Sequence, residues 1–174
     1  MAVMPSGLSP RKEKNTMRRI FRYGTHIPVL IKIMEITKGP VLELGCGFNS
    51  TPLLFWLCKD QDRKFVSYDN DQRWIEKVGY SVEYASDWDK TDIDNTHWSV
   101  AFMDHRPGER RSIDAVRLKD KADFIILHDS VSELGKFYEF EKIYPLFKYR
   151  YNYTKFLPNT TVLSNLVDIG KYLK

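Results

Sequence analysis

The stretch VLELGCGFNS, residues 41–50, decides the fold that this 174-residue chain is expected to adopt. A mostly apolar run opens there into a turn with glycine at positions 45 and 47, where little side-chain bulk blocks the approach of a ligand. A second run, FVSYDND at residues 65–71, reaches Asp69 after a helix-compatible segment. An acid about twenty residues beyond a glycine turn suits contact with a ribose. The pattern predicts two neighbouring strands whose ends hold one nucleoside.

Strand-like and helix-like segments alternate along the rest of the chain. The expected strands are 41–45, 64–68, 80–84, 98–103 and 123–128, and the expected helices between and after them are 51–59, 71–78, 108–118 and 132–146. This alternation predicts an α/β fold with a doubly wound, mainly parallel sheet and helices on both faces. Residues 149–156 and 160–167 predict a closing antiparallel hairpin, which makes seven strands.

The chain is expected to form a single domain over residues 1–174, because its length and its 43% hydrophobic content suit one core. Three segments are expected within it: a flexible tail at 1–10, N-terminal helices at 11–38 with helical patterns at 12–21 and 27–37, and a Rossmann-like core at 39–174. No internal repeat or second domain is evident.

Composition narrows the class of protein. No apolar stretch approaches the roughly 20 residues that span a bilayer, and the first nine residues lack the basic-then-apolar order of a secretion signal. Cys46 and Cys58 form no CxxC pair, so neither a disulfide framework nor a cysteine zinc site is expected. We expect a cytoplasmic protein without a membrane partner. Basic clusters at 11–22 and 106–121 fit either solvated helix faces or an acidic partner.

The Glu-x-Gly-x-Gly turn after the first strand of such a sheet resembles the first motif of the class I S-adenosylmethionine-dependent methyltransferases. The resemblance covers residues 25–170 and implies a Rossmann-like fold, S-adenosylmethionine as cofactor and methyl transfer as activity. It implies that cofactor-binding residues lie along three strand ends: Glu43, Gly45, Cys46, Gly47 and Asn49 against the methionine and ribose parts, Asp69 and Asn70 at the ribose hydroxyls, and Asp87 and Trp88 at the adenine.

NAD is the competing cofactor, because its fingerprint shares the glycine turn and the acid. Two features favour S-adenosylmethionine. Glu43 stands two residues before the first glycine, which is typical of the methyltransferase pattern, and forty residues precede the first strand, where a dinucleotide fold often starts at once.

Polar pairs follow the fourth and fifth predicted strands. Ligands of such sheets sit beyond the carboxyl ends of the strands, so Asp104-His105 and His128-Asp129 are expected to meet at one rim of the pocket. A histidine with a neighbouring carboxylate can remove a proton from an acceptor hydroxyl or amine. We therefore take Asp104, His105, His128 and Asp129 as candidate catalytic residues. The alternative is that each acid caps the loop or helix that follows it.

Asp104 and Asp129 could also bind a divalent cation such as Mg²⁺. These strand ends resemble those of the catechol-type O-methyltransferases, in which acids at both places hold magnesium. That group usually has Asn where this chain has Ser130, and a lysine base where this chain has Arg106 and Pro107. A magnesium site and a metal-free histidine base remain open alternatives.

The segment RPGERR, residues 106–111, predicts a tight turn with free amides and guanidinium groups that could hold an anion. Similar segments occur in some small sugar and polysaccharide O-methyltransferases. This makes Arg106, Arg110 and Arg111 candidate substrate-binding residues for a phosphate or carboxylate on the acceptor, although Arg110 and Arg111 could equally be salt-bridged on the helix. Aromatic residues near both ends of the chain could form a lid: Tyr23, His26, Phe137 and Tyr138.

The expected function is methyl transfer from S-adenosylmethionine to an oxygen, less readily a nitrogen, of a small anionic or sugar-like acceptor. The acceptor attacks the methyl group in line while an Asp or His removes its proton. Two alternatives come from other classes: a non-catalytic S-adenosylmethionine-binding module, and an RNA-binding or RNA-modifying protein with a methyltransferase-like core.

Overall fold

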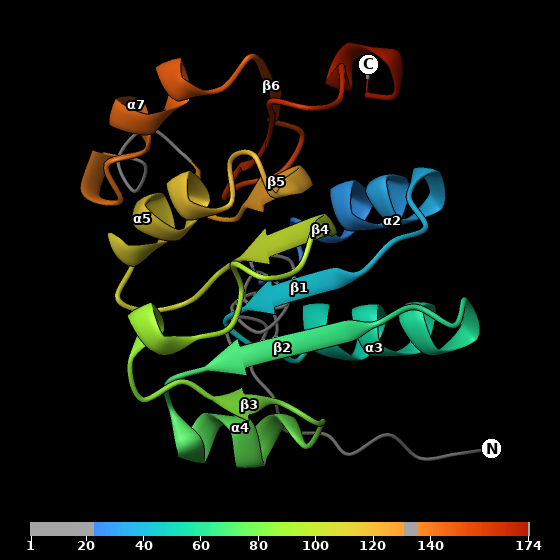
Figure 1. The fold of residues 1–174 in the computed structure, drawn as a ribbon, viewed down its shortest axis with the longest axis vertical. Helices are drawn as coiled ribbons and strands as arrows, with labels where there is room; N and C mark the ends of the chain where they lie inside the picture. The colour runs from blue at the N-terminus through green and yellow to red at the C-terminus, as the bar shows by residue number, and fades with distance from the viewer. Residues whose placement is uncertain (1–22, 131–135, 174) are drawn as a thin grey trace, which may run out of the picture.

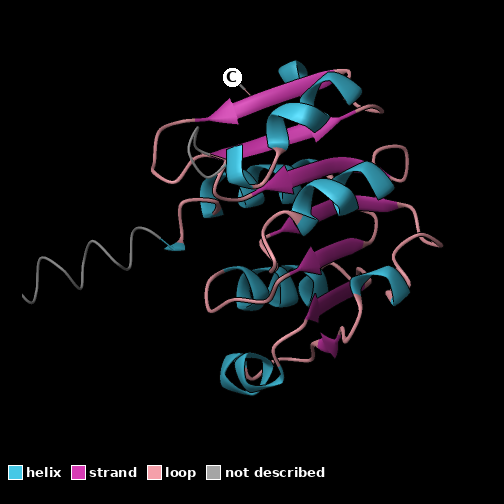
Figure 2. Ribbon diagram, turned by 90° about the vertical axis from the view of Figure 1, so that its left-hand side faces the viewer, coloured by secondary structure: helices cyan, strands magenta, loops and turns pink. Residues whose placement is uncertain are grey.

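The computed structural model describes residues 23–130 and 136–173. They form a seven-stranded sheet in the order β3-β2-β1-β4-β5-β7-β6 (Figures 1 and 2). The strands are β1 Val41–Leu44, β2 Phe65–Asp69, β3 Glu83–Tyr84, β4 Trp98–Met103, β5 Ala122–Leu127, β6 Tyr149–Tyr153 and β7 Thr160–Ser164. Strands β1 to β5 are parallel, whereas β7 runs antiparallel to β5 and β6. The predicted α/β fold with a C-terminal antiparallel hairpin is confirmed.

The helices are α2 Ile27–Ile36, α3 Ser50–Asp60, α4 Gln72–Val78, α5 Arg110–Arg117 and α7 Phe140–Ile143, with short 3-10 turns η1 Trp88–Lys90, η2 Tyr144–Leu146 and η3 Ile169–Lys171. Helices α3, α4 and α5 connect parallel strands, α2 precedes β1 and α7 follows β5; all but α7 lie close to where the sequence predicts them. Of the described helices, none combines the length and apolarity needed to cross a membrane. The predicted tail at 1–10 and helix at 12–21 lie outside the described residues.

Two predicted elements differ from the structure. The single helix predicted over 132–146 is wrong in its described part, because Glu139 has a left-handed backbone (φ +60°) that separates α7 from the residues before it. Residues 131–135 of that prediction lie outside the described part. The strand predicted at 80–84 shrinks to Glu83–Tyr84, at the edge of the sheet, where only β2 offers hydrogen-bond partners.

The alternation of side chains along each strand separates the core into two layers. On β4, Ala101 and Met103 face the layer that contains Ala115 of α5, whereas Val100 and Phe102 face the layer that contains Leu30 of α2 and Leu54 of α3. Residues of β5 divide in the same way. Apolar side chains are buried on both faces of the sheet, which explains why the central strands read as near-continuous hydrophobic runs.

The register of the central strands aligns their carboxyl ends. Leu44 pairs with Tyr68 of β2 and with Met103 of β4, and Met103 pairs with Leu127 of β5. The residues that follow these pairs therefore lie together at the carboxyl-terminal ends of the strands. Their order across the sheet is Asp69, Gly45, Asp104 and His128. This is the edge at which open α/β sheets bind their ligands.

Candidate active site

The glycine turn begins at Gly45, where the backbone is left-handed (φ +91°). A side chain at this position would also collide with the peptide between Asp104 and His105. Glycine is therefore required twice over, for its backbone conformation and for the close approach of the β4 end. Gly47, two residues further, has open space around it, since a methyl group placed there would lie 3.4 Å from its nearest neighbour, Ser50 Oγ. The turn is therefore packed tightly against the end of β4 at Gly45 and has free space at Gly47.

Asp69 at the end of β2 is fastened to this turn. The amide of Cys46 donates to Asp69 Oδ2 at 2.9 Å, and the amide of Asp71 donates to Oδ1 at 2.9 Å. Trp74 of α4 donates from Nε1 to the Cys46 carbonyl at 2.7 Å, an anchor that the sequence analysis did not identify. A carboxylate has about four acceptor positions, so both Asp69 oxygens retain capacity for a pair of ribose hydroxyls.

Glu43 lies below the turn and is fully buried. Its Oε2 accepts hydrogen bonds from Thr51 Oγ1 of α3 at 2.8 Å and from Ser67 Oγ of β2 at 2.6 Å. Burial raises the pKa of Glu43 to about 7, against the opposing effect of these hydroxyl donors. The side chain therefore ties α3 to the sheet, and the structure places it under the expected cofactor site, away from the surface that a cofactor would touch.

The other predicted cofactor residues occupy different environments. Asn49 and Asn70 lie at the open edge of the sheet, half-buried and exposed respectively. Asp87 accepts from the amide of Asp89 and pairs with Lys90 at 3.3 Å, so it caps the η1 turn. Trp88 is buried, and its Nε1 donates to the Arg106 carbonyl at 2.9 Å. The indole therefore belongs to the core of the described structure and does not present an open face for a base.

The glycine turn and Asp69 fit the S-adenosyl part of the expected cofactor. The space above Gly47 leaves the backbone accessible, and Asp69 supplies acceptors for vicinal hydroxyls. Asn49 and Asn70 flank this place and could add polar contacts. The part of the site expected to meet adenine is less complete, because Trp88 is held in the core.

Three of the four candidate catalytic residues come together. His128 Nδ1 lies 3.2 Å from Asp104 Oδ1 and 3.5 Å from Asp129 Oδ1. Asp129 reaches the group because its own backbone is left-handed (φ +58°), which turns the side chain back toward β4. The carboxylate of Asp104 is the most exposed member, with 31% of its side chain accessible against 4% for His128.

Arg111 of α5 holds this group in place. Its guanidinium lies 2.8 Å from Asp104 Oδ1 and 3.6 Å from Asp129 Oδ2. It also donates three hydrogen bonds, to the carbonyls of His105, His128 and Asp104 at 2.9, 3.2 and 2.9 Å. Only 4% of the Arg111 side chain is exposed, so Arg111 is a buried residue that holds α5 to the strand ends. The prediction that it binds an anion at the surface is therefore wrong.

The charges of this group are mutually supporting. Burial alone would raise the pKa of Asp104, but His128 and Arg111 outweigh burial and lower it. Burial alone would lower the pKa of His128, but Asp104 and Asp129 outweigh burial and raise it above the ordinary 6.5. The pair therefore favours a carboxylate beside an imidazole of increased basicity.

His105 is separated from the other three residues. Its Nε2 lies 3.0 Å from Asp114 Oδ2 of α5, and its ring packs on Trp88 with centroids 4.5 Å apart. The expectation that two acids and two imidazoles share one rim is therefore corrected. Successive residues after a strand point to opposite faces, so His105 continues the Met103 face, whereas Asp104 continues the Phe102 face.

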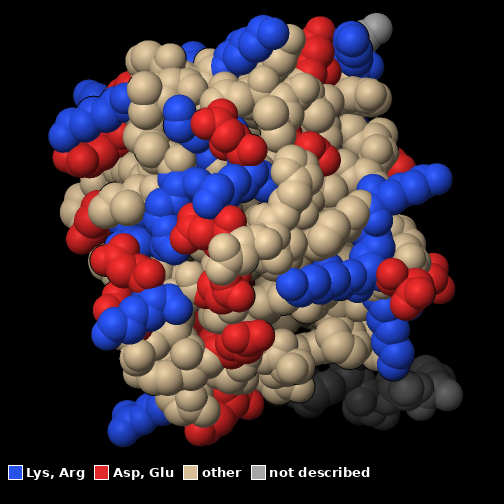
Figure 3. Space-filling view, viewed as in Figure 1, with Lys and Arg blue, Asp and Glu red and all other residues tan. Residues whose placement is uncertain are grey.

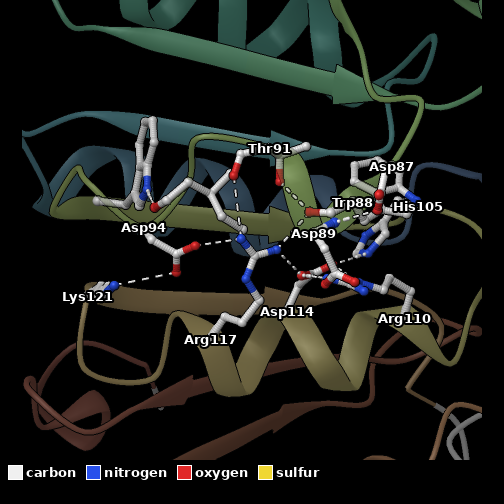
Figure 4. Close-up of polar contacts among 12 residues, drawn as sticks. Asp87, Trp88, Asp89, Thr91, Asp94, His105, Arg110, Asp114, Arg117 and Lys121 are labelled. Carbon is white, nitrogen blue, oxygen red and sulfur yellow. Dashed lines mark hydrogen bonds and ion pairs between the residues drawn. The ribbon is translucent and has the colours of Figure 1, made fainter.

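Asp114 is the centre of a buried ionic network that the sequence analysis missed (Figure 4). It is fully buried and accepts from Arg110 Nε at 2.9 Å and from Arg117 Nη1 at 2.8 Å, in addition to its contact with His105. Arg110 also reaches Asp89 at 2.6 Å. Arg110 therefore ties α5 to the η1 turn. The signal was present in the sequence, because residues 110, 114 and 117 stand at helical spacing on one face.

Two residues before α2 complete the surroundings of His128. Thr25 Oγ1 lies 3.2 Å from His128 Nε2, and the His26 ring meets the His128 ring edge-on with centroids 4.6 Å apart. Of the predicted aromatic lid, His26 is thus buried and Tyr138 lies half-buried under Arg111, whose guanidinium carbon is 4.6 Å from the ring centroid. Tyr23 and Phe137 remain 62% and 66% exposed.

The residues do not fit a magnesium site as they are arranged. Ligand atoms of Asp104, His128 and Asp129 lie within 4.8 Å of one another, which is close enough for one ion. However, the Arg111 guanidinium already contacts both carboxylates, and Mg²⁺ prefers an all-oxygen shell to an imidazole ligand. No step of the chemistry is therefore assigned to a metal.

On the face shown in Figure 3, basic and acidic side chains alternate. Arg106 is exposed, and within residues 23–130 and 136–173 it makes no side-chain ion pair, unlike Arg110 and Arg111. The apolar recess lined by Pro52, Trp56 and Tyr80 contains no residue of the predicted sites.

Comparisons with known proteins support the fold. No protein-family model matches the sequence, and no curated protein matches it either. Among solved structures, a putative O-methyltransferase from Klebsiella pneumoniae is 11% identical, with a TM-score of 0.55 over 93% of this chain and 83% of that chain. A methyltransferase from Pyrococcus furiosus is 14% identical, with a TM-score of 0.51 over 81% and 83%. The bifunctional kinase-methyltransferase WbdD is 15% identical, with a TM-score of 0.52 over 85% of this chain and 39% of WbdD. At these identities the likeness concerns the fold.

Proposed function

Because the chain has the fold of the class I S-adenosylmethionine-dependent methyltransferases, we propose that it transfers a methyl group from S-adenosylmethionine to a hydroxyl oxygen of a small acceptor. One observation carries the proposal. A partly exposed carboxylate, Asp104, stands directly beside the glycine turn and is backed by a buried histidine of raised pKa.

The cofactor side of the site is the Gly45–Gly47 turn together with Asp69. These residues orient the nucleoside, and bound S-adenosylmethionine supplies an electrophilic methyl group. The β4 end packs against Gly45, so Asp104 adjoins the turn. An acceptor held between Asp104 and the turn would meet the methyl group at contact distance, and positioning of this kind supplies most of the catalysis in a direct transfer.

The chain's own residues provide a route for the acceptor's proton. The hydroxyl donates to the accessible Asp104 carboxylate as its oxygen forms the bond to carbon. The proton then passes from Asp104 to the neutral form of His128 at Nδ1, 3.2 Å away. Asp104 returns to a carboxylate, and the imidazolium is stabilised by Asp129. Arg111 fixes both carboxylates and takes no part in the proton transfer.

The acceptor is proposed to be small and to carry an anionic or sugar-like group. Arg106 supports this choice, because it is exposed two residues after Asp104 in the chain and its side chain makes no ion pair with a described residue. Its guanidinium could bind a phosphate or carboxylate in a forked geometry. Alternating charge on the face shown in Figure 3 offers no continuous basic surface for RNA.

A transfer assay with methyl-labelled S-adenosylmethionine and a panel of sugar phosphates, hydroxy acids and catechols tests the proposal. We expect transfer by the wild type and loss of at least 100-fold in Asp104→Asn, with S-adenosylhomocysteine binding retained. The matched control is Asp123→Asn, since Asp123 pairs with His97 at the opposite edge of the sheet. Full turnover by Asp104→Asn would contradict the assignment. Cofactor binding without transfer would favour a non-catalytic module, and transfer to RNA alone would favour the RNA alternative.

A further inference from the structure

The side chain of Tyr138 is fixed beside the reaction centre. The guanidinium carbon of Arg111 lies 4.6 Å from the centre of the Tyr138 ring, and the same guanidinium contacts Asp104 at 2.8 Å. The Phe140 ring packs against the Tyr138 ring with centroids 5.5 Å apart, and the Ser112 hydroxyl of α5 donates to the Tyr138 carbonyl. A phenol is therefore held next to the proposed catalytic carboxylate, although the two residues are far apart in the chain.

Gly108 makes room for this ring. A methyl group at position 108 would overlap the ring of Tyr138 and would lie only 3.0 Å from its Cζ, the carbon that carries the hydroxyl. The hydroxyl end of the side chain therefore lies over the turn that begins with Arg106 and Pro107. That turn is itself anchored, since Trp88 Nε1 donates to the Arg106 carbonyl at 2.9 Å. The phenol and the start of the turn are thus fixed relative to one another.

Packing does not require the hydroxyl of Tyr138. A phenylalanine ring would make the same contacts with Arg111, Phe140 and Gly108. Within residues 23–130 and 136–173 the hydroxyl makes no hydrogen bond, and it is not one of the buried polar atoms that lack a partner. Because Tyr138 is only half-buried, its hydroxyl is open to a ligand.

The electrostatics at this turn favour an anionic ligand. Burial raises the pKa of the Tyr138 phenol, so at neutral pH its hydroxyl is a hydrogen-bond donor. Arg106, whose charge also acts on the phenol, is exposed and makes no ion pair with a described residue. Arg111 differs, because Asp104 and Asp129 already neutralise it. A neutral donor and a guanidinium at one turn suit a carboxylate or a phosphate, whose oxygens accept from both.

We propose that Tyr138 is an acceptor-binding residue: its hydroxyl and the Arg106 guanidinium bind an anionic group of the acceptor while the reacting hydroxyl of the acceptor meets Asp104. The bound group is a carboxylate or a phosphate monoester, since both present the oxygens that these donors need. The inference rests on the proposed function and deepens it, because it selects an anionic acceptor over a neutral sugar and names the residue that makes this choice.

Isothermal titration calorimetry of the protein saturated with S-adenosylhomocysteine tests the inference with two matched pairs of probes. Catechol is compared with 3,4-dihydroxybenzoate, which adds a carboxylate, and glucose with glucose 6-phosphate, which adds a phosphate. We expect the anionic member of at least one pair to bind at least tenfold more tightly than its neutral partner, and that pair identifies the anion. No preference for the anion in either pair would overturn the inference and leave the proposed function standing. Failure of S-adenosylhomocysteine to bind would refute the proposed function, and the inference with it.

Two variants assign the preference to the turn. Tyr138→Phe keeps the ring, so it should unfold at the same temperature as the wild type and bind S-adenosylhomocysteine within twofold. It should bind the favoured anionic probe at least tenfold more weakly and the neutral partner within twofold of the wild type. Arg106→Gln, at an exposed position, should weaken binding of the same anionic probe by a similar factor.

Tyr172→Phe is the matched control. Tyr172 is also exposed, but its ring packs beside Phe124 near the start of β5, away from the carboxyl ends of the strands. This variant should bind every probe as the wild type does. Anion binding by Tyr138→Phe or Arg106→Gln equal to that of Tyr172→Phe would overturn the inference, and so would an equal loss of the neutral and anionic probes in Tyr138→Phe.

Discussion

Replacing Arg111 with Met should destabilise the protein strongly, because the change removes the clamp between α5 and the ends of β4 and β5. The methionine side chain fills similar volume but leaves the carbonyls of Asp104, His105 and His128 without their guanidinium donor. It also leaves Asp104 and Asp129 without the cation at 2.8 and 3.6 Å. Loss of one partner of a buried ion pair costs about 3–5 kcal/mol.

That magnitude is a large share of the total stability, which is roughly 5–15 kcal/mol for a folded domain. At about 2–4 °C per kcal/mol for a chain of this size, the unfolding temperature should fall by roughly 6–20 °C. Urea unfolding followed by circular dichroism measures the free energy directly. Arg73→Met is the matched control, because Arg73 is exposed on α4 and methionine and arginine have similar helix propensity. Equal stability of Arg111→Met and Arg73→Met would refute the clamp.

Three further changes test other parts of the structure. Gly45→Ala should lower the free energy of unfolding by more than about 2 kcal/mol, because the new methyl group collides with the end of β4 and the backbone there is left-handed. It should also abolish S-adenosylhomocysteine binding in calorimetry. Stability equal to the wild type would contradict this prediction. The pKa of Glu43 is raised from 4.5 to about 7, so its contribution to stability is present below pH 4.5 and is lost as the pH rises through 7. The free energy of unfolding, measured with urea, should fall between pH 5 and pH 8 by on the order of 3 kcal/mol in the wild type because of Glu43. In Glu43→Gln this fall should be absent. Burial alone would raise the pKa of Asp114, but its partners, led by His105 and Arg110, lower it to about 2, so this stabilisation is present above about pH 4 and is lost as the pH falls toward 2. In Asp114→Asn the free energy of unfolding should fall less steeply between pH 4 and pH 2 than in the wild type. An equally steep fall would contradict the proposed role of the network.

Local signals in the sequence were sufficient for the sheet and its binding edge. The glycine turn, the acid that ends β2 and the polar residues after β4 and β5 each follow a short apolar run, and parallel strands bring such ends together. The register of β1, β2, β4 and β5 confirms this arrangement. The helix predicted over 132–146 was wrong because helical periodicity does not reveal a left-handed residue such as Glu139.

Side-chain direction was harder to predict than strand position. Strand alternation alone would have separated His105 from Asp104, and the same rule would have sent Asp129 away from His128. Asp129 joins His128 only because its backbone is left-handed, a feature with no clear sequence signal. The contact of Thr25 and His26 with His128 depends on how the segment before α2 folds over the sheet, and no local pattern encodes a contact between positions 103 residues apart.

The central claim is that the edge formed by Gly45, Asp69 and Asp104 binds a sulfur nucleoside. Isothermal titration calorimetry with S-adenosylhomocysteine tests it most directly, with NAD as the competing ligand and Asp69→Asn compared with the control Asp123→Asn. We predict micromolar binding to the wild type and to Asp123→Asn, at least tenfold weaker binding to Asp69→Asn, and no binding of NAD. Absence of S-adenosylhomocysteine binding, or equal affinity in Asp69→Asn, would contradict the claim.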